Sequence, residues 1–255
     1  MKKSEENHIV DLAEFDQSIS LFQLIPAGNG KGLSLLKKIV DYILTAKPGR
    51  IPSVLIIGAQ GIRTHARALI RALGIEDVRE TDGLLLQPCS ALIDYFRNPS
   101  QDTGYIIAGA HYLDKLVQPL FVDILTNQKF NMYNFVRESK ETYCVQGLLV
   151  MTSRAITLIP PPMRQLFDYI VEIEPFSYDQ KILLGLQRIK YCGIGYRSEE
   201  VLEEIVMRTN GNLRQMVHLL QIAITLISAE GRVELDIQDI RRAADLLPTS
   251  IQSKS

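Results

Sequence analysis

The sequence predicts an α/β protein, a parallel-sheet sandwich of strands and helices that is followed by a small all-α domain. Up to about residue 174, short apolar runs alternate with stretches of helical periodicity, as expected for strands buried on both faces. The run 53–57 opens directly onto a glycine-containing turn and then a helix, which is the first half of a strand–helix–strand unit. After residue 175 only helical stretches follow.

Each expected element of the first part has its own signal. Apolar residues recur at helical spacing in the first helix, which the Lys47–Pro52 segment closes, and Gly74 ends the next one. The expected strands are continuous apolar runs. In order, we expect a helix at 33–45, a strand at 53–57, a helix at 64–74, a short apolar run at 84–86, a helix at 88–98, a strand at 104–108, a helix at 113–126, and strands at 147–151 and 169–173.

The second part reads as four helices joined by short polar segments. Ser198 is a typical N-cap residue, and two acids follow it in the first turn, where they favour the positive end of a helix. We expect helices at 180–191, 199–209, 214–229 and 237–247. The predicted domains are an N-terminal extension at 1–32, an α/β domain at 33–174, a helical domain at 175–248 and a tail at 249–255.

Composition narrows the class of protein. The chain has 255 residues, 46% of them hydrophobic and 22% charged, which is typical of a folded domain with its own core. No apolar run approaches the roughly 20 residues that span a bilayer, and the polar start is unlike a signal peptide. We therefore expect a cytoplasmic protein without a membrane partner.

Charge and cysteine content argue against a general nucleic-acid-binding protein and against a protein held together by zinc or disulfides. The chain has 28 basic and 29 acidic residues, so no general attraction to nucleic acid is expected, and any such contact would be indirect. Cys89, Cys144 and Cys192 lack the paired spacing of a zinc site and are too few for a disulfide framework. We expect no metal site.

The second part also carries the strongest likeness to a known family. The segment 198–214, which ends in Gly211-Asn212-Leu213-Arg214, resembles the lid helix and Gly-x-x-Arg sensor-2 turn of AAA+ ATPases. The segment 233–247 is similar to their closing lid helix. The likeness is greatest to RuvB-like motor cores, which act in Holliday-junction branch migration, and it covers roughly residues 33–248. It implies an AAA+ αβα sandwich with a lid, an ATP site and assembly with other AAA+ subunits.

The phosphate loop implied by this resemblance has changed chemistry. The family pattern is G-x-x-x-x-G-K-[ST], in which backbone N–H groups cradle phosphates, Lys contacts them and the hydroxyl binds Mg²⁺. The matching residues start at Gly58 and include Gly61, but Arg63 replaces the second glycine, Thr64 the lysine and His65 the hydroxyl. Arginine at a glycine position restricts the backbone where phosphate approaches. Thr64 would reach the metal position only if the loop shifted by one residue, although the free N–H groups of the following helix could retain some anion affinity.

The position that matches the family's second nucleotide motif, Walker B, has also lost its usual residues. In the family an apolar strand ends in Asp-Glu, where Asp organises Mg²⁺ and Glu polarises the attacking water. Here the strand is followed by Ala108 and Gly109, which can neither hold a metal nor accept a proton. His111 lies in line with a histidine often found after this motif, and we interpret it as structural.

Other family positions are partly kept. Thr152 lies in the segment that resembles sensor 1, where a polar side chain contacts the γ-phosphate. Arg164 matches an arginine finger that would act on a neighbouring subunit, or it forms a surface ion pair, and both interpretations stay open. Arg214 matches sensor 2, with a salt bridge or a helix-cap role as the alternative.

These residues predict a catalytically inactive AAA+-like protein that serves as a structural or interaction subunit of an AAA+ or DNA-processing assembly. The expected partner is another AAA+ protein or a second copy, in a ring or as its cap. We expect no obligatory cofactor, although ATP or ADP binding without hydrolysis is compatible with the six residues of the altered nucleotide site: Gly58, Gly61, Arg63, Thr64, Thr152 and Arg214. Two alternatives stay open, a nucleotide-binding switch or weak AAA+ ATPase, and a DNA-binding adaptor.

Overall fold

The computed structural model describes residues 30–46, 50, 52–87, 89–97, 102–131 and 142–247. Nearly all of the expected N-terminal extension and the whole expected tail lie outside the described residues. The chain separates into two compact units, an α/β unit that ends at Pro175 and a helical unit that begins at Phe176. Each unit has its own core and is described by itself.

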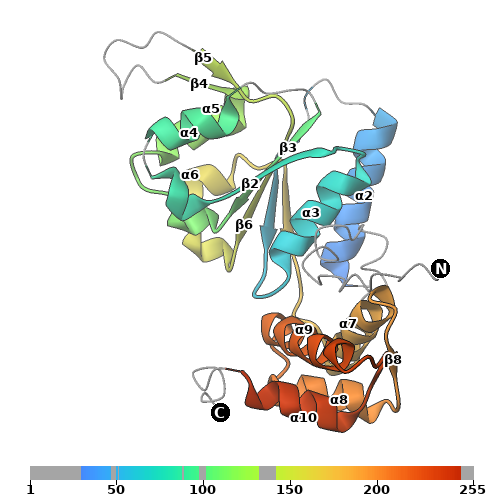
Figure 1. Cartoon of the computed structure of the whole chain (residues 1–255). Coiled ribbons are helices and arrows are strands. Elements are labelled where there is room, and N and C mark those ends of the chain that lie inside the picture. The colour runs from blue at the N-terminus through green and yellow to red at the C-terminus, as the bar shows by residue number, and fades with distance from the viewer. Residues whose placement is uncertain are drawn as a thin grey trace, which may run out of the picture. The chain divides into compact units, whose positions relative to one another are not determined.

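A five-stranded parallel sheet forms the centre of the α/β unit (Figure 1). Its order is β2-β3-β6-β1-β7, and every neighbouring pair is parallel. The strands are β1 (Val54–Ile57), β2 (Asp77–Asp82), β3 (Thr103–Ala108), β6 (Leu148–Ser153) and β7 (Tyr169–Glu172). The predicted fold class, an α/β parallel sheet followed by a helical part, is confirmed.

Helices cover both faces of this sheet. On one face lie α2 (Lys31–Ala46) and α3 (Ile62–Ala72), which contact the strands directly (Figure 1). On the other lie α4 (Cys89–Phe96), α5 (Gln118–Asn127) and the short α6 (Pro161–Arg164). Three short 3₁₀ segments, η2 (Gly83–Leu86), η3 (Ala110–Tyr112) and η4 (Ile156–Leu158), follow strands β2, β3 and β6, and a small hairpin joins β4 (Lys129–Asn131) to β5 (Thr142–Cys144).

The strands are buried because they are apolar along their whole length. All four residues of β1 and all six of β3 and β6 are buried, which fits a sheet covered on both faces. Alternate strand residues such as Leu55, Tyr105 and Met151 pack with aromatic side chains from the α4–α5 side, including Phe96 and Phe121. Burial of these side chains is the main force that holds the sheet together.

One strand of the central sheet was not predicted from the sequence, and neither were the short strands β4, β5, β8 and β9. β2 (Asp77–Asp82) is highly charged, so it lacks the apolar signal on which the expected strands were based. It can be a strand because it lies at the edge of the sheet, where its side chains remain partly exposed and pair with arginines. The apolar run 84–86 belongs to η2, and α5 begins at Gln118 and not at residue 113.

The helical unit is built from four helices around a separate core. They are α7 (Tyr178–Tyr191), α8 (Glu200–Arg208), α9 (Leu213–Ala229) and α10 (Ile237–Asp245). Buried aliphatic side chains from α8, α9 and α10, such as Ile205, Leu219 and Ile240, fill the centre. A short parallel pair, β8 (Gly195–Tyr196) with β9 (Glu234–Leu235), joins the connections between the helices.

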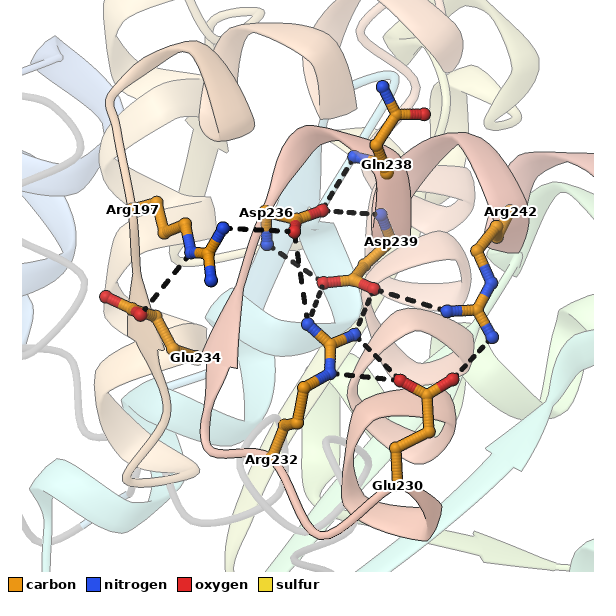
Figure 2. Close-up of polar contacts among 8 residues, drawn as sticks. All are labelled: Arg197, Glu230, Arg232, Glu234, Asp236, Gln238, Asp239 and Arg242. Atoms are coloured by element: carbon orange, nitrogen blue, oxygen red, sulfur yellow. Dashed lines mark hydrogen bonds and ion pairs between the residues drawn. The ribbon is translucent and has the colours of Figure 1, made fainter.

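An ion-pair network fixes the start of α10 (Figure 2). Asp239 is only 2% exposed, and both of its carboxylate oxygens accept hydrogen bonds from Arg232. Arg242 bridges Asp239 to Glu230, with its Nη2 2.5 Å from Glu230 Oε1. Burial alone would raise the pKa of Asp239, but the hydrogen bonds from Arg232 and from the Asp236 backbone outweigh it and lower that pKa. Asp236 completes the network as the N-cap of α10.

A pair of glycine substitutions tests the backbone at one end of the sheet. Gly147 has φ +120°, and a Cβ there would lie 2.0 Å from the carbonyl oxygen of Thr103. We expect Gly147→Ala to lower the free energy of unfolding by about 3 kcal/mol or more, because strain and a backbone clash add together. Gly74 has φ +75° with nothing within 4 Å of its Cβ position, so Gly74→Ala should cost only about 1 kcal/mol. Urea unfolding followed by circular dichroism compares them, and equal losses would contradict the close approach at Gly147.

A second pair of substitutions tests the network of the helical unit. Asp239→Ala removes the buried partner of Arg232, which keeps Glu230 and Asp236, and one half of the capping box of α10, so it should destabilise the unit by about 2 kcal/mol or more. Glu234 pairs with Arg197 on the surface, with both side chains more than half exposed, so Glu234→Ala should cost less than about 0.5 kcal/mol. Thermal unfolding of the two variants is the measurement. A small loss for Asp239→Ala would show that the network contributes little.

Candidate functional site

The candidate site lies where parallel strands of the α/β unit end, the edge at which loops of such sheets gather. β1 ends at Ile57, and the N–H of Gly58 then donates to the carbonyl oxygen of Ser153 at 3.1 Å, which continues the β1–β6 pairing. A Cβ at Gly58 would lie 2.8 Å from the carbonyl oxygen of Ile173. Glycine is required there because the chain passes so close to the end of β7. Gly61 has φ +70° and is the N-cap of α3.

The phosphate-loop segment is shorter than the family pattern implies. Helix α3 begins at Ile62, so only 58–61 separate it from β1. The first helical hydrogen bond runs from the His65 N–H to the Gly61 carbonyl oxygen at 3.1 Å. Arg63 and Thr64 therefore lie in the first turn of α3 and not in a loop. The N–H groups of residues 62–64 precede the first helical hydrogen bond, as is usual at a helix N-terminus.

The side chain of Arg63 is paired with acids of β2. Its Nη2 lies 2.6 Å from Asp82 Oδ2, and its Nη1 lies 3.9 Å from Glu80 Oε1. One turn further along α3, Arg67 binds Glu80 through Nε at 2.6 Å and Nη2 at 3.0 Å. The two acids were not predicted as site residues, because β2 lacks the apolar signal of the other strands of the sheet. Their spacing of two residues on a strand, facing arginines spaced by four on a helix, is a signal that could have suggested the pairing.

The end of β3 has a left-handed backbone conformation that favours glycine. Gly109 follows the strand with φ +64°, and a Cβ there would lie 2.7 Å from the Tyr112 ring and 3.6 Å from Asp82 Oδ1. Its N–H donates to Thr152 Oγ1 over 3.4 Å. Thr152 is buried on β6, so its hydroxyl contacts the strand-end backbone of the α/β unit.

Two histidines lie at this edge of the sheet. His65 is 3% exposed, and its Nδ1 lies 2.8 Å from the Gly61 carbonyl oxygen, so Nδ1 carries the proton. Burial lowers the pKa of His65, and the hydrogen bond to Gly61 only partly offsets this. Burial and the nearby positive charge of Arg154 also lower the pKa of His111, whose Nδ1 lies 3.2 Å from Ser153 Oγ. Both histidines thus contact neighbouring groups of the chain at this edge.

The two remaining predicted site residues lie on separate helices. Arg164 ends α6, and its Nε donates to the Ile159 carbonyl oxygen at 2.8 Å, a local contact that neither interpretation of this residue anticipated. Arg214 is exposed in the first turn of α9 in the helical unit. Asn212 caps that helix by accepting hydrogen bonds from the N–H groups of Arg214 and Gln215. The structure thus brings Gly58, Gly61, Arg63, Thr64 and Thr152 into one unit.

Within the described ranges, no three His, Cys, Asp or Glu side chains are grouped so that they could hold a metal ion. No helix in the same ranges combines the length and apolar character needed to cross a bilayer.

Comparison of the structure with solved structures identifies the fold. A point variant of Thermotoga maritima RuvB matches with a TM-score of 0.74 at 16% identity, over 89% of this chain and 72% of that chain. The T. maritima RuvB Holliday-junction branch-migration motor matches with a TM-score of 0.72 at 16% identity, over 91% of this chain and 73% of that chain. No protein-family model and no curated protein matches the sequence. The predicted RuvB-like AAA+ fold is confirmed.

The buried His65 predicts a pH dependence of stability. Because its pKa is lower in the folded chain than the ordinary value of 6.5, the unfolded chain binds more protons just below that pH. Stability is therefore present above about pH 6.5 and is lost as the pH falls through the folded pKa. We expect His65→Asn, which keeps an N–H near the Nδ1 position, to reduce the loss of stability as the pH falls below about 6.5.

Urea unfolding at several pH values measures this effect. His218→Asn is the matched control, since His218 is exposed on α9 of the helical unit. An identical pH profile for His65→Asn and the wild type would contradict the assignment of the buried, neutral imidazole.

Proposed function

We propose that this chain is a cytoplasmic, catalytically inactive AAA+-like subunit that acts through protein contacts within an AAA+ or DNA-processing assembly. Its partner is another AAA+ protein or a second copy of itself, in a ring or as the cap of one. The RuvB-like fold supports the architecture, and the residues at the carboxyl ends of β1 and β3 support the loss of catalysis.

The observation that carries the proposal is the conformation of Gly109. In the family pattern this position bears the glutamate that polarises water, and the preceding position, here Ala108, bears the metal-organising aspartate. Gly109 has a left-handed backbone, and the Tyr112 ring fills the direction in which a side chain would project. The end of β3 is therefore occupied by a residue without a side chain, packed against the Tyr112 ring, and this supports the proposed loss of the catalytic acid.

The phosphate side of the site supports the same conclusion. Phosphoryl transfer depends on a charge clamp of Lys, metal ion and hydroxyl around the leaving and transferred groups. Thr64 and His65 stand at the lysine and hydroxyl positions, and the His65 ring is buried against Gly61. Losing such a clamp removes several kcal/mol of transition-state stabilisation, so useful turnover by this chain alone is not expected.

A group of exposed apolar side chains suits a role in contact with other proteins. Four large apolar side chains near the carboxyl ends of β2 and β3 are 46% to 66% exposed: Leu84, Leu85, Tyr112 and Leu116. Exposed apolar side chains at a strand edge that has lost its polar chemistry fit docking better than solvation. ATP or ADP binding without hydrolysis remains compatible with this role.

The proposal predicts that the purified chain hydrolyses ATP below roughly 0.001 per second with Mg²⁺ present, far under usual enzyme rates. A coupled phosphate-release assay measures the rate. Thr152→Val and Arg214→Ala serve as controls, because a rate that belongs to this chain should change in them and a rate from a contaminant should not. Robust turnover that these substitutions abolish would overturn the inactive assignment.

The partner is tested by mixing the chain with candidate AAA+ ATPases and measuring complex formation and ATPase rate. A complex with an active AAA+ protein, or a defined homo-oligomer, supports the structural role. Tight nucleotide binding that changes complex formation would favour a nucleotide-responsive switch. A salt-sensitive complex with DNA alone would favour a DNA-binding adaptor.

A further inference from the structure

Asp82 uses its two carboxylate oxygens for two separate contacts. Oδ2 accepts from Arg63 Nη2 at 2.6 Å, and Oδ1 accepts from the N–H of Leu84 at 3.1 Å, which starts η2. The carboxylate therefore joins the first turn of α3 to the turn that follows β2.

The position of this carboxylate is set by the sheet. In the parallel register of β2 and β3, Asp82 lies opposite Ala108. Asp82 Oδ1 is also 3.6 Å from the Cβ position of Gly109. A carboxylate thus stands beside the strand end where an ATPase of this fold has its own acids, but it comes from the neighbouring strand and contacts an arginine.

We propose that Asp82 is an internal anion that occupies Arg63 and keeps phosphate groups away from the first turn of α3. This rests on the proposed function, since it explains how the nucleotide site of an inactive subunit is kept closed. The guanidinium and the free N–H groups of the first helical turn are the positive groups that would attract a polyphosphate. Asp82 neutralises the guanidinium of Arg63 and repels a second anion from the same space.

The second pair of charges holds this arrangement in place. Glu80 and Asp82 lie two residues apart on β2, so their side chains leave the same side of the strand. Arg63 and Arg67 lie four residues apart on α3, so they share one face of the helix. The Arg67–Glu80 contact is bidentate, which fixes the helix against the strand and presents Arg63 to Asp82.

The backbone next to Asp82 is closely packed. A Cβ at Gly83 would lie 2.6 Å from the carbonyl oxygen of Gly109, so the start of η2 packs directly on the end of β3. An incoming anion would therefore compete with Asp82 for Arg63. The pair is partly exposed, with 50% of the Arg63 side chain and 31% of the Asp82 side chain accessible, so it acts by occupying the guanidinium rather than by a large pair energy.

Asp82→Asn tests the proposal, since it removes the charge and keeps an oxygen that can cap η2. Calorimetric titration with tripolyphosphate, and with ATP in the absence of Mg²⁺, should show binding at least about tenfold tighter than for the wild type. Adding Arg63→Ala to Asp82→Asn should abolish the gain. Asp94→Asn is the matched control, because it removes the same charge from another arginine pair of this unit, Asp94–Arg97, and should bind as the wild type does.

Unchanged affinity in Asp82→Asn, or an equal gain in Asp94→Asn, would overturn the proposal. If Asp82→Asn fails to fold, Asp82→Ser replaces it, because serine is also a good cap residue. In addition, hydrogen exchange of the wild-type chain should show no tripolyphosphate-dependent protection at residues 62–64 or Leu84, and such protection would contradict a closed site. ATP hydrolysis by the wild type would instead contradict the proposed function, so failure of the inference and failure of the proposed function are distinguishable.

Discussion

The parallel hydrogen-bond ladder of the five-stranded sheet determines where every group of the candidate site lies. Because β1 lies between β6 and β7, the end of Ile57 is fixed beside Ser153 and Glu172, and the turn at Gly58 begins there. Because β2 pairs with β3, Asp82 is placed opposite Ala108. The burial of apolar side chains on both faces maintains this ladder. The apolar core thus fixes the positions of the polar groups at the carboxyl edge of the sheet.

On this scaffold, ion pairs and a left-handed glycine lie at the carboxyl ends of β2 and β3. Arg63 and Arg67 connect α3 to β2 through Glu80 and Asp82, and Gly109 brings the backbone of β3 against Tyr112. The helical unit follows the same principle, since Arg232 and Asp239 secure the start of α10 beside an aliphatic core. Charged side chains in both units therefore satisfy one another within the chain.

The sequence alone predicted the elements whose side chains are buried, and it predicted the RuvB-like fold. The apolar strands around 54–57, 103–108 and 148–153 and the four helices of the helical unit have strong periodic signals, since burial selects their side chains. β2 could not be found this way, because its stability comes from pairing with one neighbour and from arginines on α3. Likewise, the contact of Arg63 with Asp82 joins residues 19 positions apart, and only the sheet register shows that they meet.

The left-handed backbone at Gly109 also bears on how such a chain could change over time. Placing glutamate there in one step would force a side chain against the Tyr112 ring and strain the backbone, whatever stands at Ala108. An acid pair at Ala108 and Gly109 would therefore also require the Tyr112 ring to move. The backbone of this strand end thus limits which single substitutions it can accept without rearrangement, whatever the activity of the chain.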